Sequence, residues 1–147
     1  MAERTEREAL RHLIDICKDG ERGFRAAAAA VNDPKLRTLF INLAEERARF
    51  ATALLPHLQR LGGTLEHAGT GAGALHRTWI NVKAHVPGHG DHAIVTEAER
   101  GEYAALDAYD EALHGMLPPT VTDLIEAQQE AMHHAVDRIR EIDMGYL

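Results

Sequence analysis

The sequence predicts an all-α protein, a four-helix bundle of two helical hairpins that a long crossover segment joins. Apolar residues recur in alternating steps of three and four along most of the chain, which is the period of a helix packed on one side. The alternation typical of strands is nearly absent. With 147 residues, the chain can build one compact core and is too short for a second independent one. We therefore expect a single bundle domain over residues 1–147.

The first hairpin is expected between residues 10 and 61. The apolar stripe of its first helix is Leu10, Ile14, Cys17, Phe24, Ala28 and Val31. Asp33 is the predicted N-cap of the second helix and Pro34 its first residue, an arrangement typical of helix starts. The second helix carries Leu36, Leu39, Phe40, Leu43, Phe50, Leu54, Leu58 and Leu61. Pro56 predicts a kink in it, because proline removes one backbone hydrogen bond.

The crossover is expected over residues 62–91. Its glycine-rich part, TLEHAGTGAGA, predicts a loop, and a short helix follows with the apolar face Leu75, Trp79, Val82 and Val86. The sequence PGHGDH then breaks this short helix. Two hairpins joined by one long crossover have the layout of ferritin-like bundles.

The second hairpin follows the crossover. Its first helix is expected from about Asp91 to Gly115, with the inward residues Val95, Leu106, Tyr109, Leu113 and Met116. Thr120 and Asp123 have the spacing of a capping box and predict the start of the last helix. The inward stripe of that helix is Val121, Ile125, Gln128, Met132, Ala135 and Ile139.

Four glutamates fall where the stripes should be apolar. Glu21 lies between Cys17 and Phe24, and Glu46 follows Leu43 by three residues, a boundary position that it shares with Arg47. In the third long helix, Glu99 and Glu102 continue the stripe that begins at Val95. We therefore expect the carboxylates of Glu21, Glu46, Glu99 and Glu102 at one level of the interior.

Carboxylates that are buried together need a partner, a proton or a metal, because an unpaired buried ion costs several kcal/mol. One hypothesis is a weak site for a divalent metal, iron or manganese, in which these glutamates are the ligands. The alternative is a metal-free structural or interaction module, homodimeric, whose glutamates are held by Arg22, Arg47, Arg77 or Arg100, or by Tyr109 and Gln128. The sequence leaves both open and predicts no catalytic residue.

The histidines give only secondary metal candidates. Residue 49, three positions after Glu46, is an arginine, so no Glu-x-x-His pair forms there. Glu130 and His133 have that spacing, but they share a face with Asp123, Glu126 and Asp137, which indicates a solvated surface. A third hypothesis is that His85, His89, Asp91 and His92 gather a divalent ion at the PGHGDH break.

Several segments resemble an uncharacterised bacterial family of ferritin-like four-helix-bundle proteins. They are AGALHRTWINVK at 72–83, DHAIVTEAERGEYAALDAYDEAL at 91–113, DGERGF at 19–24, the NDP break at 32–34 and LGG at 61–63. The resemblance implies a ferritin-like fold and implies no activity. In the fourth helix of the family, a histidine precedes the Asp-Arg-Ile step, where this chain has Val136.

Composition excludes several classes of function. The net charge of −7 argues against nucleic-acid binding, which needs a basic face, and no apolar run approaches the roughly 20 residues of a membrane span. A single cysteine, Cys17, rules out an internal disulfide and fits a reducing compartment. With a charged N-terminus in place of a secretory signal, we expect a cytoplasmic protein that forms a homodimer.

Overall fold

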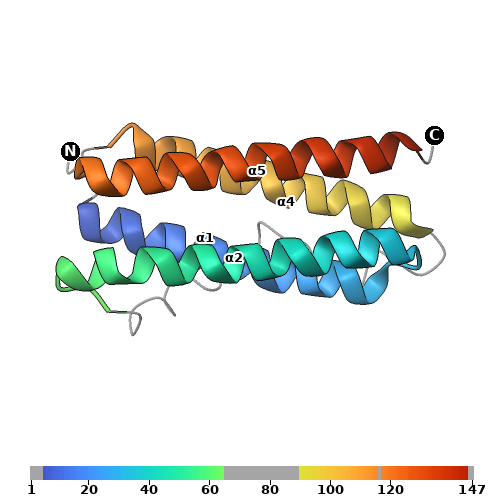
Figure 1. Ribbon diagram of the computed structural model, residues 1–147, viewed down its shortest axis with the longest axis horizontal. Helices are drawn as coiled ribbons and strands as arrows, with labels where there is room; N and C mark the ends of the chain where they lie inside the picture. Colours follow the sequence, from blue (N-terminus) through green and yellow to red (C-terminus); the bar gives the residue numbers. More distant parts are fainter. Residues whose placement is uncertain (1–4, 65–89, 116, 146–147) are drawn as a thin grey trace.

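The computed structural model confirms an all-α four-helix bundle. It describes residues 5–64, 90–115 and 117–145, and no strand occurs among them. The helices are α1 (Glu6–Ala30), α2 (Pro34–Arg60), α4 (Gly90–Leu113) and α5 (Pro119–Gly145). They form two antiparallel hairpins, α1 with α2 and α4 with α5, whose axes run along the long dimension of the molecule (Figure 1). The short helix expected around Trp79 lies outside the described residues.

The starts of α1 and α2 follow local sequence signals. Thr5 caps α1 by accepting a hydrogen bond from the Glu8 backbone nitrogen, and Asp33 caps α2 as predicted. The predicted capping box of α5 is wrong, because this helix begins at Pro119 and Thr120 already lies inside it. α2 continues through Pro56 to Arg60.

The packing order places α2 and α4 on a diagonal of the bundle. α1 packs on both α2 and α4, and α5 packs on α4 and, over a smaller area, on α2. The backbones of α2 and α4 have no close approach. Any direct contact between these two helices must therefore be made by long side chains that cross the centre.

The apolar core is divided into two clusters along the bundle. One surrounds Leu13, Leu54, Tyr109 and Ile125, and the other surrounds Phe24, Phe40, Ile94 and Ile139. The stripes predicted from the sequence are buried wherever the structure describes their side chains, except that Phe50, Leu61 and Leu113 are only partly buried. Polar side chains are buried together with these clusters, among them Arg47, Glu102 and Gln128.

The two hairpins are also connected at the end where α4 begins. The Asp91 carboxylate accepts hydrogen bonds from the backbone nitrogens of Asn32 and Asp33, both at 2.8 Å. His92 Nδ1 lies 2.6 Å from Asp143 Oδ1 near the end of α5. These contacts give Asp91 and His92 structural partners. His85 and His89, the other two residues of the predicted ion site, lie outside the described part of the chain.

No helix within the described ranges has both the length and the apolar character that crossing a membrane requires.

Candidate functional site: a buried charged layer

An ion pair between Arg47 and Glu102 occupies the centre of the bundle. Arg47 comes from α2 and Glu102 from α4, so the pair bridges the diagonal that the backbones leave open. Arg47 Nη1 donates to Glu102 Oε1 at 2.6 Å, and Nη2 donates to Oε2. Both side chains are only 1% exposed. The pair is therefore bidentate and dry, the geometry in which a guanidinium and a carboxylate interact most strongly.

Aromatic rings complete the environment of Arg47. Its guanidinium carbon lies 5.3 Å from the ring centre of Phe24 and 5.8 Å from that of Phe50. Both distances are within the range of cation–π attraction. Burial alone would lower the pKa of Arg47, but the charge and hydrogen bonds of Glu102 outweigh it and raise that pKa. The arginine stays charged, and its charge is compensated inside the core.

A chain of hydrogen bonds extends the layer to the other two helices. Cys17 Sγ on α1 lies 3.0 Å from the Tyr109 hydroxyl on α4, which donates to Gln128 Oε1 on α5 at 2.6 Å. Gln128 Nε2 donates in turn to the Phe50 carbonyl on α2 at 3.3 Å. Burial raises the pKa of Cys17 to about 11, so the sulfur is a neutral thiol at physiological pH. All four helices therefore meet in this polar layer.

Of the four predicted inward glutamates, only Glu102 is fully buried. Glu21 retains 29% of its side-chain exposure and pairs with Arg25, one turn along α1, at 3.1 Å. Glu99 is half-buried and makes no hydrogen bond or ion pair within the described residues. Glu46 is also half-buried, and its Oε1 is shielded from solvent without a hydrogen-bond partner.

Electrostatics couple Glu46 to the central pair. Burial is the main reason that the pKa of Glu46 is raised; Arg47 lowers this pKa and Glu102 raises it. Both charges of the central pair therefore act on the Glu46 carboxyl.

The secondary metal candidates on α5, Glu130 and His133, lie on the surface. Glu130 and His133 are both exposed on α5, as the sequence predicts. Glu130 makes an exposed i,i+4 contact with His134, whose Nε2 is 3.9 Å from Glu130 Oε1.

The layer does not have the arrangement of a metal centre. Across residues 5–64, 90–115 and 117–145, no three His, Cys, Asp or Glu side chains are grouped as metal ligands. The most buried carboxylate, Glu102, uses both oxygens to accept from Arg47, and the guanidinium adds a positive charge where a cation would sit. A metal could bind Glu102 only if Arg47 moved away.

The fold and this layer define a four-helix bundle whose centre is an ion pair rather than a preformed ligand cluster. A family model described as Domain of unknown function (DUF2383) matches residues 5–115, which is three-quarters of the chain. The chain therefore belongs to this family, an uncharacterised helical family as the sequence resemblance indicates. No curated protein matches the chain.

Proposed function

We propose that this protein is a metal-independent interaction module that acts as a homodimer, with its central glutamate held by an arginine. The observation that supports metal independence most directly is the buried, bidentate pair of Arg47 and Glu102. A divalent cation would have to displace a guanidinium that two aromatic rings flank, and would leave that guanidinium buried without a counter-ion.

The surface that we assign to the dimer is an exposed stripe on α2. Arg37, Ile41 and Glu45 follow one another at four-residue intervals and so share one side of the helix. Ile41 is 40% exposed, which makes it one of the few large apolar side chains open to solvent in the described residues. Arg37 donates to the Val31 carbonyl through Nη2 alone, and Glu45 has no ion-pair partner in the described residues.

This stripe is complementary to its own copy. In a two-fold dimer, the same surface meets itself with the helices antiparallel. With the axis at Ile41, the two isoleucines pack together, and Arg37 of each copy faces Glu45 of the other. The charges then flank an apolar centre, as the polar rim of an interface does.

A charge-swap experiment tests the dimer. Arg37→Glu and Glu45→Arg each place like charges together and should shift the protein from dimer to monomer in light scattering coupled to size exclusion. The combination of both substitutions restores opposite charges and should restore the dimer. Lys35→Glu makes the same charge change on another side of α2 and serves as the control. A monomeric parent, or a double variant no better than the single ones, would refute this interface.

Divalent metal binding by Glu21, Glu46, Glu99 and Glu102 is the competing proposal, and the unpartnered buried oxygen of Glu46 favours it. It is tested by elemental analysis of untagged protein purified without chelator, before and after aerobic loading with iron. Near-stoichiometric iron or manganese that disappears in Glu99→Ala would support this competitor over the metal-independent module. Protein that takes up no metal would support the module.

A further inference from the structure

One side of α4 carries a tyrosine between two carboxylates. Glu99, Tyr103 and Asp107 follow one another at four-residue intervals, so they lie about 6 Å apart along one side of the helix. Tyr103 is 43% exposed and Asp107 is exposed, whereas Glu99 is half-buried. None of the three makes a hydrogen bond or an ion pair within the described residues. These three residues are called the α4 stripe below.

The hairpin that carries the α4 stripe is strongly acidic. The lysine and arginine residues of α4 and α5 are Arg100, Arg138 and Arg140, and the acidic residues of α4 alone outnumber them. Arg100 already pairs with Glu97. In α1 and α2, by contrast, lysine and arginine outnumber aspartate and glutamate. The negative potential of the protein is therefore concentrated on the second hairpin, where it attracts basic partners and repels acidic ones.

An arginine side chain matches the α4 stripe in chemistry. A guanidinium stacks flat on an aromatic ring, and its edge donates hydrogen bonds to carboxylates beside the ring. The ammonium group of lysine is more strongly hydrated and lacks this planar face. In an extended chain, alternate residues point the same way about 7 Å apart, which is close to the spacing along the α4 stripe. A segment with arginines at alternate positions therefore places one arginine on the ring and one at each carboxylate.

We propose that the α4 stripe binds a basic, extended segment of a partner protein, with one arginine on Tyr103 and its basic neighbours at Glu99 and Asp107. The proposal rests on the interaction role proposed above and adds the chemistry of a partner. It uses a different surface from the dimer, because α2 and α4 lie on a diagonal of the bundle and a dimer through α2 leaves this side of α4 open. The charge-swap test of the dimer and the test of this site therefore fail independently.

The test uses the full-length protein and the blocked pentapeptide acetyl-Arg-Ser-Arg-Ser-Arg-amide, with binding measured by isothermal titration calorimetry at pH 7.5 and low ionic strength. A matched pentapeptide has lysine in place of each arginine and carries the same charge. The arginine peptide should bind saturably and at least about twofold more tightly than the lysine peptide, because only a guanidinium stacks on the ring. Added salt should weaken both peptides.

Variants of the protein separate the ring from the charges. Tyr103→Leu keeps an apolar side chain without the ring, so it should weaken the arginine peptide about two- to fivefold and remove the preference over lysine. The double variant Glu99→Gln with Asp107→Asn should weaken both peptides. Glu130→Gln with Asp137→Asn makes the same charge change on the exposed side of α5 and should bind nearly as the parent does. Circular dichroism checks that each variant is folded.

Three results would overturn the proposal. The first is no saturable binding of the arginine peptide up to tens of millimolar. The second is a folded Tyr103→Leu variant that still prefers the arginine peptide as the parent does. The third is an α5 double variant that loses as much affinity as the α4 double variant, because the acidic hairpin would then attract cations without a site on α4.

Discussion

Replacing Glu102 by glutamine removes the counter-charge of a fully buried arginine and nearly nothing else. Arg47 and Glu102 are each only 1% exposed, so water cannot solvate the guanidinium that is left behind. Loss of one partner from a buried pair costs roughly 3–5 kcal/mol. We expect the lower part of that range, about 3 kcal/mol, because the amide oxygen still accepts one hydrogen bond. The free energy of unfolding of a native domain is only about 5–15 kcal/mol, so this loss is a large fraction of the total stability.

Urea unfolding followed by circular dichroism measures this loss as a lower midpoint with an unchanged slope. Glu21→Gln is the matched control, because the Glu21–Arg25 pair is partly exposed and such pairs contribute only about 0.3–0.5 kcal/mol. The double variant Arg47→Met with Glu102→Leu removes both charges and should lie within about 1 kcal/mol of the parent. A Glu102→Gln cost below about 1 kcal/mol, or a double variant that loses the sum of the two single effects, would refute the reasoning.

Two glycines and one aspartate give further predictions. A Cβ at Gly20 would lie 3.4 Å from Arg47 Nη1, an ordinary contact, so Gly20→Ala should raise the melting temperature through its gain in helix propensity, about 1 kcal/mol. At Gly63 the added carbon would lie 2.8 Å from Leu58 Cγ in the core. Gly63→Ala should therefore lower the melting temperature, and the free energy of unfolding should fall by about 1–3 kcal/mol. Equal shifts of the melting temperature in the two glycine variants would contradict this packing. Burial raises the pKa of Asp15 from 3.8 to about 6. The folded protein therefore holds this proton more tightly than the unfolded chain, and stability falls as pH rises from about 4 to 6. Asp15→Asn should flatten that part of the melting-temperature profile, and an unchanged slope would show that another group causes it.

The sequence predicts the helices and their apolar faces well, because each stripe is a local periodic pattern. It predicts the charged positions less well, because two consecutive residues often fit one stripe equally. Glu46 and Arg47 both lie between Leu43 and Phe50 at steps of three and four. The structure buries Arg47, because Glu102 lies across the diagonal to pair with it.

The same ambiguity occurs on α1. Gly20 and Glu21 both fit between Cys17 and Phe24, and the interior takes Gly20, against which the Arg47 side chain lies. Glu21 is left at the boundary, where Arg25 pairs with it. These outcomes depend on contacts between helices distant in sequence, which periodicity does not contain.

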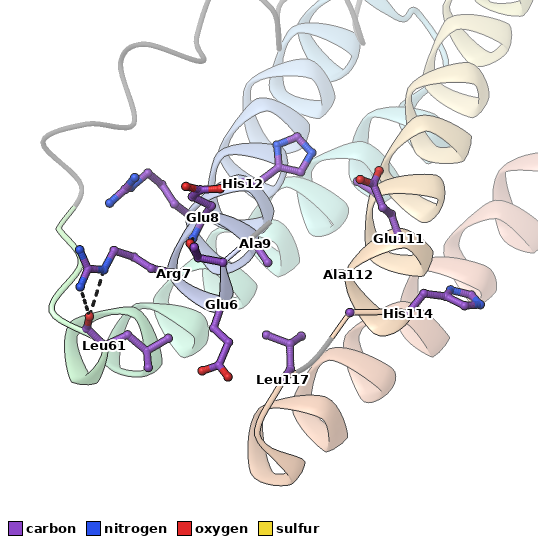
Figure 2. A pocket seen from close by; sticks show the side chains of 14 residues that line it. Glu6, Arg7, Glu8, Ala9, His12, Leu61, Glu111, Ala112, His114 and Leu117 are labelled. Atoms are coloured by element: carbon purple, nitrogen blue, oxygen red, sulfur yellow. Dashed lines mark hydrogen bonds between the residues drawn. The ribbon is translucent and has the colours of Figure 1, made fainter. Parts of the chain in front are cut away.

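The sequence does not predict the cavity of about 1180 Å³ at the end of the bundle where α1 begins (Figure 2). Glu6, Arg11 and Glu111 are among the residues that line it, and no shared motif in the sequence connects them. Charged residues near helix ends are ordinary in sequence, so neither periodicity nor motifs indicate which of them line a cavity.

The most direct test of the central claim, that Arg47 rather than a metal holds Glu102, is urea unfolding of the parent protein under anaerobic conditions. The midpoint is compared in excess Mn²⁺ or Fe²⁺ and in chelator. Our account predicts the same midpoint in every condition, because the carboxylate already has its counter-ion. The account would be contradicted by a midpoint that rises with metal concentration and that no longer rises in Glu102→Gln. For a metal at a hundredfold excess over its Kd, that rise corresponds to roughly 2.7 kcal/mol in the free energy of unfolding.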